Sequence, residues 1–338
     1  MPAVQTTHLH LLETLQALSE ADGPPGREGT LRRLAARHLH PSMRHVRVSP
    51  LGSLYAERTS ARGARLMLTA ALDEPAFIVS HVDRDGIAWL HPSGRIDPDS
   101  CAGALIRFPG GLQGTIGVVS PEAGERGPAR LLADLGADER EHAVRVGSMG
   151  VFATPWLAER TTIQGKALDS RLGAALALEV AGRTARSPNS LVLALTALGQ
   201  LGHRAAQGAA TELAPAAAIT LGAYAADGKR VVGASDVRVG KGPVILLRSN
   251  RYVADSRLVE ALRAAAIRAR IPYQLAVAAE DPTGAAAVQS SLDGIPTATV
   301  LVPCAGVGTP RQQLETHDLD AAAELLVRLV ERPFMGQR

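Results

Sequence analysis

An acidic residue at a strand-to-helix junction is the first place where this chain suggests chemistry. Residues 165–173 read GKALDSRLG and open a helix that we predict over residues 171–185, because apolar residues recur there close to the 3.6-residue period of a buried helical face. At such a junction Asp169 or Ser170 can cap the helix by accepting backbone N–H bonds. Alternatively, the Asp169 carboxylate can bridge two metal ions, and this interpretation requires further ligands elsewhere in the chain.

Other chemically capable side chains are spread along the sequence. Two histidine pairs have i, i+2 spacing, which points the rings of a pair apart on a helix and favours surface or capping roles: His8 with His10, and His38 with His40. We interpret His203 as part of a solvated loop, with a place in a cleft as the alternative. Residues 315–318 are interpreted as a helix cap in preference to a metal site, and Cys304 as a small buried thiol in preference to a nucleophile.

Composition limits the function classes. The 338 residues are 46% hydrophobic, 20% charged and 3% aromatic, which is typical of a globular protein of about two domains whose core is built from Ala, Val, Leu and Ile. A formal charge of +3 without a basic run interleaved with aromatics argues against a nucleic-acid partner. The chain contains no stretch long enough to span a membrane. Its two cysteines form no C-x-x-C pair, so we expect reduced thiols and a cytoplasmic protein.

The order of predicted elements indicates two kinds of structure. Short strands separated by Gly, Pro and Asp turns are predicted at 77–82, 87–90, 104–108, 114–119 and 144–152, which is typical of a small β-barrel. Residues 124–141 are interpreted as a loose, charged connection within it. Before and after this region helices alternate with strands, including a strand pair around 231–239 and 244–247 and a final helix over 318–330 capped by Asp318.

We therefore predict an α/β fold: a doubly wound mixed sheet of the zinc-peptidase type with an inserted small β-barrel domain. Residues 1–76 and 161–338 form the α/β domain, and residues 77–160 form the insertion.

This layout and six motifs resemble the TET family of dinuclear metallo-aminopeptidases, which includes glutamyl and deblocking aminopeptidases and proteins called endoglucanase M. Residues 70–77 (AALDEPAF) resemble the family's AHMDEIGF, and residues 166–173 (KALDSRLG) resemble KALDDRxG. Residues 239–245 (VGKGPVI) and 271–274 (IPYQ) resemble LGKGPxI and IPYQ. Within the insertion, residues 134–137 (DLGA) and 144–147 (VRVG) resemble DIGA and GVxVGD.

The resemblance implies two zinc or cobalt ions bridged by an aspartate and a water, with a glutamate base. Asp169 matches the bridging aspartate, and Asp73 matches a residue that orients a metal-binding histidine in the family. The remaining family positions carry residues with weak donors or none: Ala71 for that histidine, Gly199 for the glutamate base, Gln200 for a glutamate ligand, Gly222 for an aspartate ligand and Gly308 for the last histidine.

We therefore predict an aminopeptidase-family protein that is not catalytic, and we expect it to bind no cofactor. Its predicted role is binding, scaffolding or regulation in peptide metabolism. Its cleft would offer Asp73, Asp169, Arg171 and Gln200 to a peptide or basic ligand. One alternative is an active zinc or cobalt aminopeptidase with unusual ligands, and another is a different hydrolase that uses Cys304 or Ser170. By family resemblance we expect a homo-oligomer, from dimer to dodecamer, assembled through the inserted domain, or co-assembly with an active paralogue.

Overall fold

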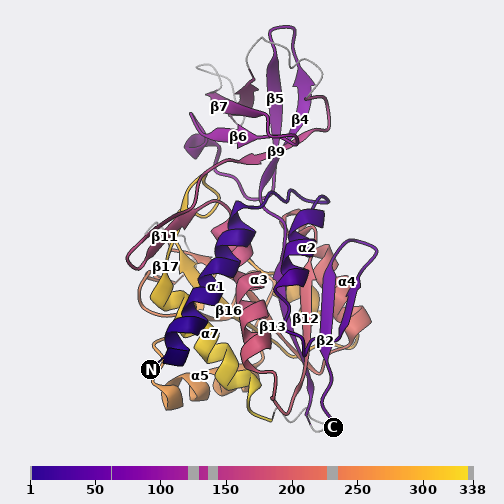
Figure 1. Ribbon diagram of the computed structural model, residues 1–338, viewed down its shortest axis with the longest axis vertical. Coiled ribbons are helices and arrows are strands. Elements are labelled where there is room, and N and C mark those ends of the chain that lie inside the picture. Colours follow the sequence, from indigo (N-terminus) through magenta and orange to yellow (C-terminus); the bar gives the residue numbers. More distant parts are fainter. Residues whose placement is uncertain (1, 62, 121–128, 136–143, 227–234, 334–338) are drawn as a thin grey trace.

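The computed structural model describes residues 2–61, 63–120, 129–135, 144–226 and 235–333. A β-barrel stands on one end of a larger α/β body, and the chain enters and leaves the barrel at the same side (Figure 1). This confirms the predicted mixed α/β fold with an inserted barrel. In the described residues, no helix is both long and apolar enough to cross a membrane.

An eight-stranded mixed sheet forms the centre of the α/β body. The strands lie in the order β1-β2-β12-β3-β13-β16-β14-β15. The central strands β12, β3, β13 and β16 run parallel to one another, whereas β1, β2 and β14 bring antiparallel pairings to the flanks. Their bounds are β1 His45–Val48, β2 Leu54–Arg58, β3 Arg65–Ala71, β12 Ser190–Thr196, β13 Ala217–Ala225, β14 Val244–Arg248, β15 Gln274–Val277 and β16 Thr297–Cys304.

Helices cover both faces of this sheet, as the near-continuous burial of its central strands requires. One face packs on α1 Pro2–Glu20, α2 Gly29–Arg37, α3 Leu168–Arg183, α5 Ser256–Ala269 and α7 Thr316–Val330. The other face packs on α4 Arg204–Leu213 and α6 Ala285–Gln289. A separate three-stranded sheet, made of β10 Leu157–Glu159, β11 Thr162–Gly165 and β17 Gln312–Glu315, lies below the barrel (Figure 1).

Six antiparallel strands close the inserted barrel in the order β4-β5-β8-β7-β6-β9. Their bounds are β4 Ala76–Val82, β5 Ile87–Ser93, β6 Leu105–Arg107, β7 Gln113–Val119, β8 Arg130–Asp134 and β9 Met149–Phe152. The interpretation of residues 124–141 as a connection is wrong, because strand β8 lies within them and pairs with both β5 and β7. Its side chains alternate between the two faces, with Leu131 and Ala133 buried. Its short length concealed the period-2 pattern.

Three further local predictions are wrong. Helix α3 begins at Leu168 after Ala167, with no side-chain cap, so neither Asp169 nor Ser170 caps it. Asp318 does not cap α7; its carboxylate accepts the N–H groups of Gly240 and Gly242, each at 2.6 Å. Residues 235–239 form no strand, and residues 231–234 of that prediction lie outside the described residues.

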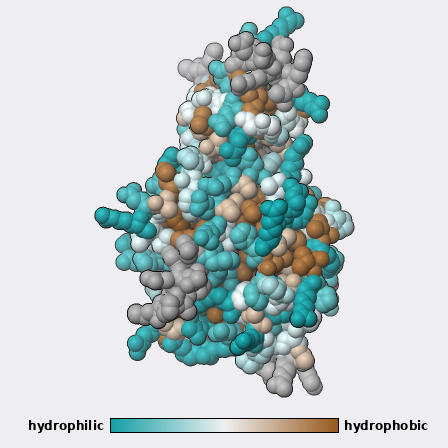
Figure 2. Space-filling model, in the orientation of Figure 1, coloured by the Kyte–Doolittle hydropathy of each residue, from teal (hydrophilic) through white to brown (hydrophobic). Residues whose placement is uncertain are grey.

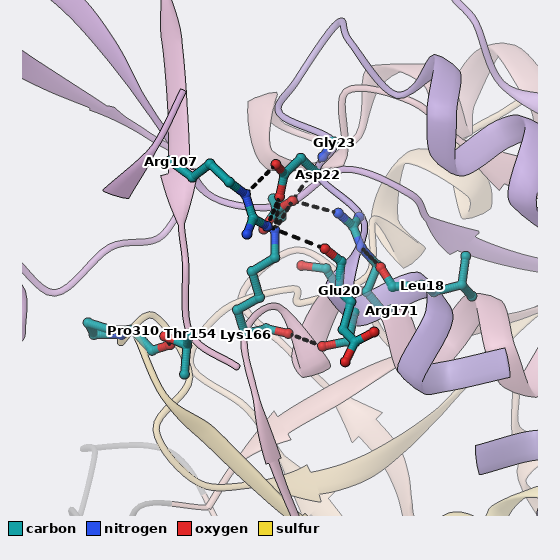
Figure 3. A network of polar contacts seen from close by, with 12 residues as sticks. Leu18, Glu20, Asp22, Gly23, Arg107, Thr154, Lys166, Arg171 and Pro310 are labelled. Carbon is teal, nitrogen blue, oxygen red and sulfur yellow. Dashed lines mark hydrogen bonds and ion pairs between the residues drawn. The ribbon is translucent and has the colours of Figure 1, made fainter. Parts of the chain in front are cut away.

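A network of buried and half-buried ionic groups joins the barrel to the α/β body (Figure 3). Lys166, only 1% exposed, donates to Glu74 Oε2 at 2.9 Å and to Asp22 Oδ1 at 2.7 Å. Arg107, on barrel strand β6, makes a two-pronged pair with the same Asp22 carboxylate at 2.6 and 2.8 Å. Arg171, fully buried, donates to Glu74 Oε1 at 3.0 Å. The network therefore fixes the start of α3, the end of α1 and the barrel relative to one another.

Candidate functional site

A cavity of about 420 Å³ opens at the carboxyl ends of the central strands, the place where open α/β sheets bind ligands. Its walls come from the ends of β3 and β13 and from the segments that follow β12 and β15. The polar side chains in the lining are Arg95, Asp169, Ser170, Gln200, His203, Tyr224, Glu280, Asp281 and Thr283. Most of the remaining surface is Gly and Ala, which is why the cavity has room for a ligand.

Asp169 and Gln200 lie in the same wall and are linked through Ser170. The Ser170 hydroxyl donates to Asp169 Oδ1 at 3.2 Å, and Gln200 Nε2 donates to Ser170 Oγ at 3.1 Å. Gln200 Oε1 accepts the backbone N–H of Arg95, at the end of the barrel, at 3.3 Å. A chain of hydrogen bonds therefore runs from the barrel through Gln200 to Asp169.

Burial controls the protonation of Asp169. It raises the pKa of the carboxyl above its ordinary value, against the lowering effects of hydrogen bonds from Gln312 and Ser170 and of the Arg171 charge. A carboxylate in this state binds a cation favourably, because a nearby positive charge offsets the cost of keeping the group ionised away from water.

Asp73 is fully buried behind the cavity and does not line it. Its Oδ1 accepts the N–H of Gly199 at 2.7 Å and its Oδ2 the N–H of Gln200 at 2.8 Å. Burial raises the pKa of Asp73 to about 6 in spite of these two bonds. Asp73 therefore holds the turn after β12, the short 3₁₀ helix η2 Gly199–Leu201, against the end of β3.

Arg171 also lies outside the cavity lining. Besides its pair with Glu74, its Nε donates to the carbonyl of Leu18 at 3.1 Å. The guanidinium lowers the pKa of both Asp73 and Asp169 through its charge. Its role is therefore to stabilise the two carboxylates from within the protein.

His203 lies in the cavity wall, so its interpretation as a residue of a solvated loop is wrong. Burial lowers the pKa of its imidazole, although the Asp281 charge acts in the opposite direction. The Asp281 carboxylate itself accepts the backbone N–H groups of Thr283, Ala285 and Ala286, at the start of α6. Cys304, by contrast, is fully buried and is not part of the lining, as predicted for a small buried thiol.

Neighbouring protein groups crowd three glycines that match family site positions. A Cβ atom on Gly199 would lie 2.5 Å from Ala71 Cβ, and one on Gly222 would lie 2.9 Å from Thr283 Cγ2. A Cβ on Gly308 would lie 3.3 Å from the carbonyl oxygen of Arg95. A side chain at Gly199 or Gly222 would therefore require a neighbouring group to move, and one at Gly308 would be tightly packed.

Comparison with known proteins identifies the family. The M42 glutamyl aminopeptidase family model matches residues 52–325. The chain belongs to this family. A putative aminopeptidase of Acetivibrio thermocellus is 23% identical over 95% of this chain and 98% of its own length. The aminopeptidase of the archaeon Desulfurococcus kamchatkensis has a TM-score of 0.87 at 24% identity, over 96% of this chain and 95% of its own.

A third similar structure bears on assembly. The TET1 peptidase of Pyrococcus horikoshii, which can form a tetrahedron or a large octahedral shell, has a TM-score of 0.81 at 23% identity, over 95% of this chain and 99% of its own. The structural comparisons confirm the predicted α/β fold with its inserted barrel.

The residues present do not fit the dinuclear metal centre that family resemblance implies. Among the described residues, no three His, Cys, Asp or Glu side chains gather closely enough to hold a metal ion. Of the matched positions, Asp169 offers a carboxylate and Gln200 only a neutral amide that is already bonded on both sides. A catalytic zinc requires about three protein ligands from His, Cys, Asp or Glu.

Several residues of the cavity lining were not predicted from the sequence. Arg95 comes from the barrel, and Glu280, Asp281 and Thr283 come from the segment after β15. A signal for the second group existed, since polar residues that follow a parallel strand lie at the ligand-binding edge of the sheet. Arg95 carried no comparable signal, because its position depends on how the barrel sits on the α/β body.

The crowding at Gly199 predicts a measurable strain. We expect Gly199→Ala to lower the free energy of unfolding by about 1–3 kcal/mol, because the new methyl would lie 2.5 Å from Ala71 Cβ and 2.8 Å from Asp73 Oδ1. Gly208→Ala is the matched control: Gly208 is in α4 with no atom near its Cβ position, so it should raise the free energy by about 0.5–1 kcal/mol. Chemical denaturation measures both. An unchanged free energy of unfolding in Gly199→Ala would show that the turn can move enough to accept a side chain.

The raised pKa of Asp73 predicts that the stability of the protein depends on pH. Because its pKa is raised from 3.8 to about 6, the folded protein binds more protons than the unfolded chain between these values, and the free energy of unfolding falls as pH rises through them. We expect that fall to be larger in the wild type than in Asp73→Asn by on the order of 3 kcal/mol, since one pKa unit corresponds to about 1.4 kcal/mol. Urea denaturation at intervals across this window measures it, and equal slopes in the two proteins would contradict the assignment.

Proposed function

We propose that this M42-family chain is a non-catalytic member that uses its cleft to bind a ligand carrying a basic group. The observation that carries the proposal is the donor set: of the six positions matched to metal ligands or to the base, five hold Ala, Gly or Gln, and neighbouring groups crowd all three glycines among them. Loss of a general base alone costs about 10²–10⁴ in rate, and loss of the metal ligands removes the means of activating water.

The charges around the cavity support a basic ligand. Its lining contains the carboxylates of Asp169, Glu280 and Asp281 but a single arginine, Arg95. The lowered pKa of His203 favours its neutral form, so it adds no compensating charge near neutral pH. The ammonium group of a peptide, or a lysine or arginine side chain, complements this arrangement.

Neither proposed nucleophile of a different hydrolase gains support. Ser170 Oγ lies between Asp169 and Gln200, and it follows no nucleophile-elbow motif. Cys304 is fully buried, outside the cavity lining. We therefore place binding, scaffolding or regulation in peptide metabolism ahead of a second hydrolytic chemistry.

The homologous assemblies support a proposal about quaternary structure. Because the TET1 peptidase forms closed shells, we propose that this chain also forms a homo-oligomer through the barrel, or joins an active paralogue in a mixed assembly. In either arrangement the cleft would hold a peptide without cleaving it.

The test of the non-catalytic assignment is metal content and activity in one sample. Purified protein is incubated with zinc or cobalt, dialysed, and assayed by elemental analysis and with leucyl, glutamyl and lysyl aminopeptidase substrates. We expect less than one metal ion per chain and no turnover, because too few ligands remain. Two metal ions per chain together with peptide hydrolysis would overturn the proposal and favour the active alternative with unusual ligands.

Ligand binding is tested by thermal unfolding with the dipeptide lysyl-alanine. We expect it to raise the melting temperature, since a ligand at a hundred times its Kd stabilises the folded state by about 2.7 kcal/mol, whereas N-acetyl-alanine should have no effect. Asp169→Asn should remove the response. Asp293→Asn, a change at an exposed carboxylate outside the lining, should keep it. Equal responses in both variants would show that Asp169 does not bind the basic group.

A further inference from the structure

The most uneven charge distribution in the chain lies far from the cleft in sequence, in α2 and β1. Residues 27–47 contain six arginines, three histidines and one acidic residue, a formal charge of +5, whereas the complete chain carries +3. The acidic residue, Glu28, is buried and accepts the N–H groups of Gly26 at 2.8 Å and Leu198 at 3.0 Å. Its charge therefore faces inward, away from the arginines.

Most of these basic side chains reach the surface. We use the name basic edge for the exposed residues of this segment: Arg27, Arg33, Arg37, Arg44, His45, Val46, Arg47 and Val48. Helix α2 and the β1–β2 turn are joined by a hydrogen bond from Arg32 Nη1 to the carbonyl of Gly52, at 2.8 Å. This bond holds the helix beside the turn that follows the strand.

Among the described residues, nearby carboxylates neutralise one arginine of the basic edge and leave others unpaired. Glu57, opposite His45 in the β1–β2 register, pairs with Arg65 at 2.8 Å. Glu212 pairs with Arg47, which also stacks over the Tyr55 ring. Within the described part of the chain, the guanidinium groups of Arg27, Arg37 and Arg44 make no ion pair or hydrogen bond.

Strand β1 is also an open edge of the eight-stranded sheet. Among the strands that the structure describes it pairs with β2 alone, and all four of its residues are exposed. Val46 and Val48, 45% and 53% exposed, lie opposite Ala56 and Leu54 and so share the sheet face that packs on α2. Apolar and hydrophilic side chains lie next to each other on the visible surface of the α/β body (Figure 2). The outer side of β1 thus offers backbone groups, two valines and a basic rim.

We propose that the basic edge binds an acidic, extended segment of a partner protein, which adds to the sheet as a strand beside β1. Added strands gain main-chain hydrogen bonds, and flanking side chains supply specificity. Charged residues on an edge strand disfavour pairing with an identical edge, so two copies of this chain would bring arginines together, whereas an acidic strand meets opposite charge. The proposal does not depend on the cleft or on its ligand.

The test uses full-length protein and three labelled ten-residue probes. One alternates Glu and Val, one alternates Lys and Val, and one alternates Glu and Pro, which keeps the charge but cannot pair as a strand. We expect the Glu-Val peptide to bind at least tenfold more tightly than the other two, with an affinity that falls as salt rises. Hydrogen exchange should slow at residues 45–48 in its presence.

Matched charge reversals locate the site. The triple variant Arg33→Glu, Arg37→Glu and Arg44→Glu should weaken Glu-Val binding at least tenfold. The control Arg145→Glu, Arg251→Glu and Arg268→Glu alters net charge equally at exposed arginines elsewhere and should change it less than twofold. Both variants must keep the wild-type melting transition, and Val46→Ser with Val48→Ser, which leaves the charge unchanged, gives a second measurement that should weaken binding severalfold.

Several results would overturn the proposal. Equal binding of the Glu-Pro peptide would show attraction by charge without strand addition. An equal loss of Glu-Val peptide affinity in the control triple variant would show that the peptide does not bind at the basic edge. Tighter binding of a single-stranded oligonucleotide or of phosphatidylserine vesicles than of the Glu-Val peptide would assign the surface to a different class of partner.

Discussion

The buried contact between Glu74 and the two cations Lys166 and Arg171 is the constraint on which the rest of the site depends. The Glu74 carboxylate accepts hydrogen bonds from both cations and, at 2.9 Å, from the backbone N–H of Gly23. The side chains of Glu74, Lys166 and Arg171 are almost completely buried. Removing one partner from such a cluster leaves an uncompensated buried charge, which costs about 3–5 kcal/mol. The cluster therefore tolerates little change in any of its three side chains.

Its position explains which parts of the family site persist. Glu74 follows Asp73 directly, and Lys166 and Arg171 flank Asp169, so the contact fixes Asp169 in the cavity wall and Asp73 behind it. Asp73 has a structural task of its own, because it accepts two backbone N–H groups of the turn after β12. Gly222 and Gly308 have no side chain that could form such hydrogen bonds, and neighbouring groups crowd both positions.

The fold was readable from the sequence because its signals are local and repeated. Alternating helices and strands, the cluster of short strands and six ordered motifs predicted the doubly wound sheet and the barrel, and the comparisons confirm that assignment. Strand β8 escaped because five residues beside a charged segment carry too little periodicity. The misplaced caps at Asp169 and Asp318 reflect tertiary partners, Gln312 for the former and the 240–242 turn for the latter, which propensity does not encode.

The site was predicted in part. Motif matching pointed to Asp169 and Gln200, which lie together in the cavity wall, but it also pointed to Asp73 and Arg171, which the structure places behind the wall. The opposite side, from Arg95 to Thr283, depends on the docking of the barrel and on a loop after β15. Contacts of that kind join residues far apart in the chain, so no local pattern reports them.

The central claim, that the remaining side chains cannot assemble a two-metal centre, is tested most directly by crystals soaked in zinc and measured at the zinc absorption edge. The account predicts no pair of anomalous peaks beside Asp169, and Gln200 still bonded to Ser170. Two peaks about 3.5–4 Å apart, bridged by the Asp169 carboxylate, would contradict it.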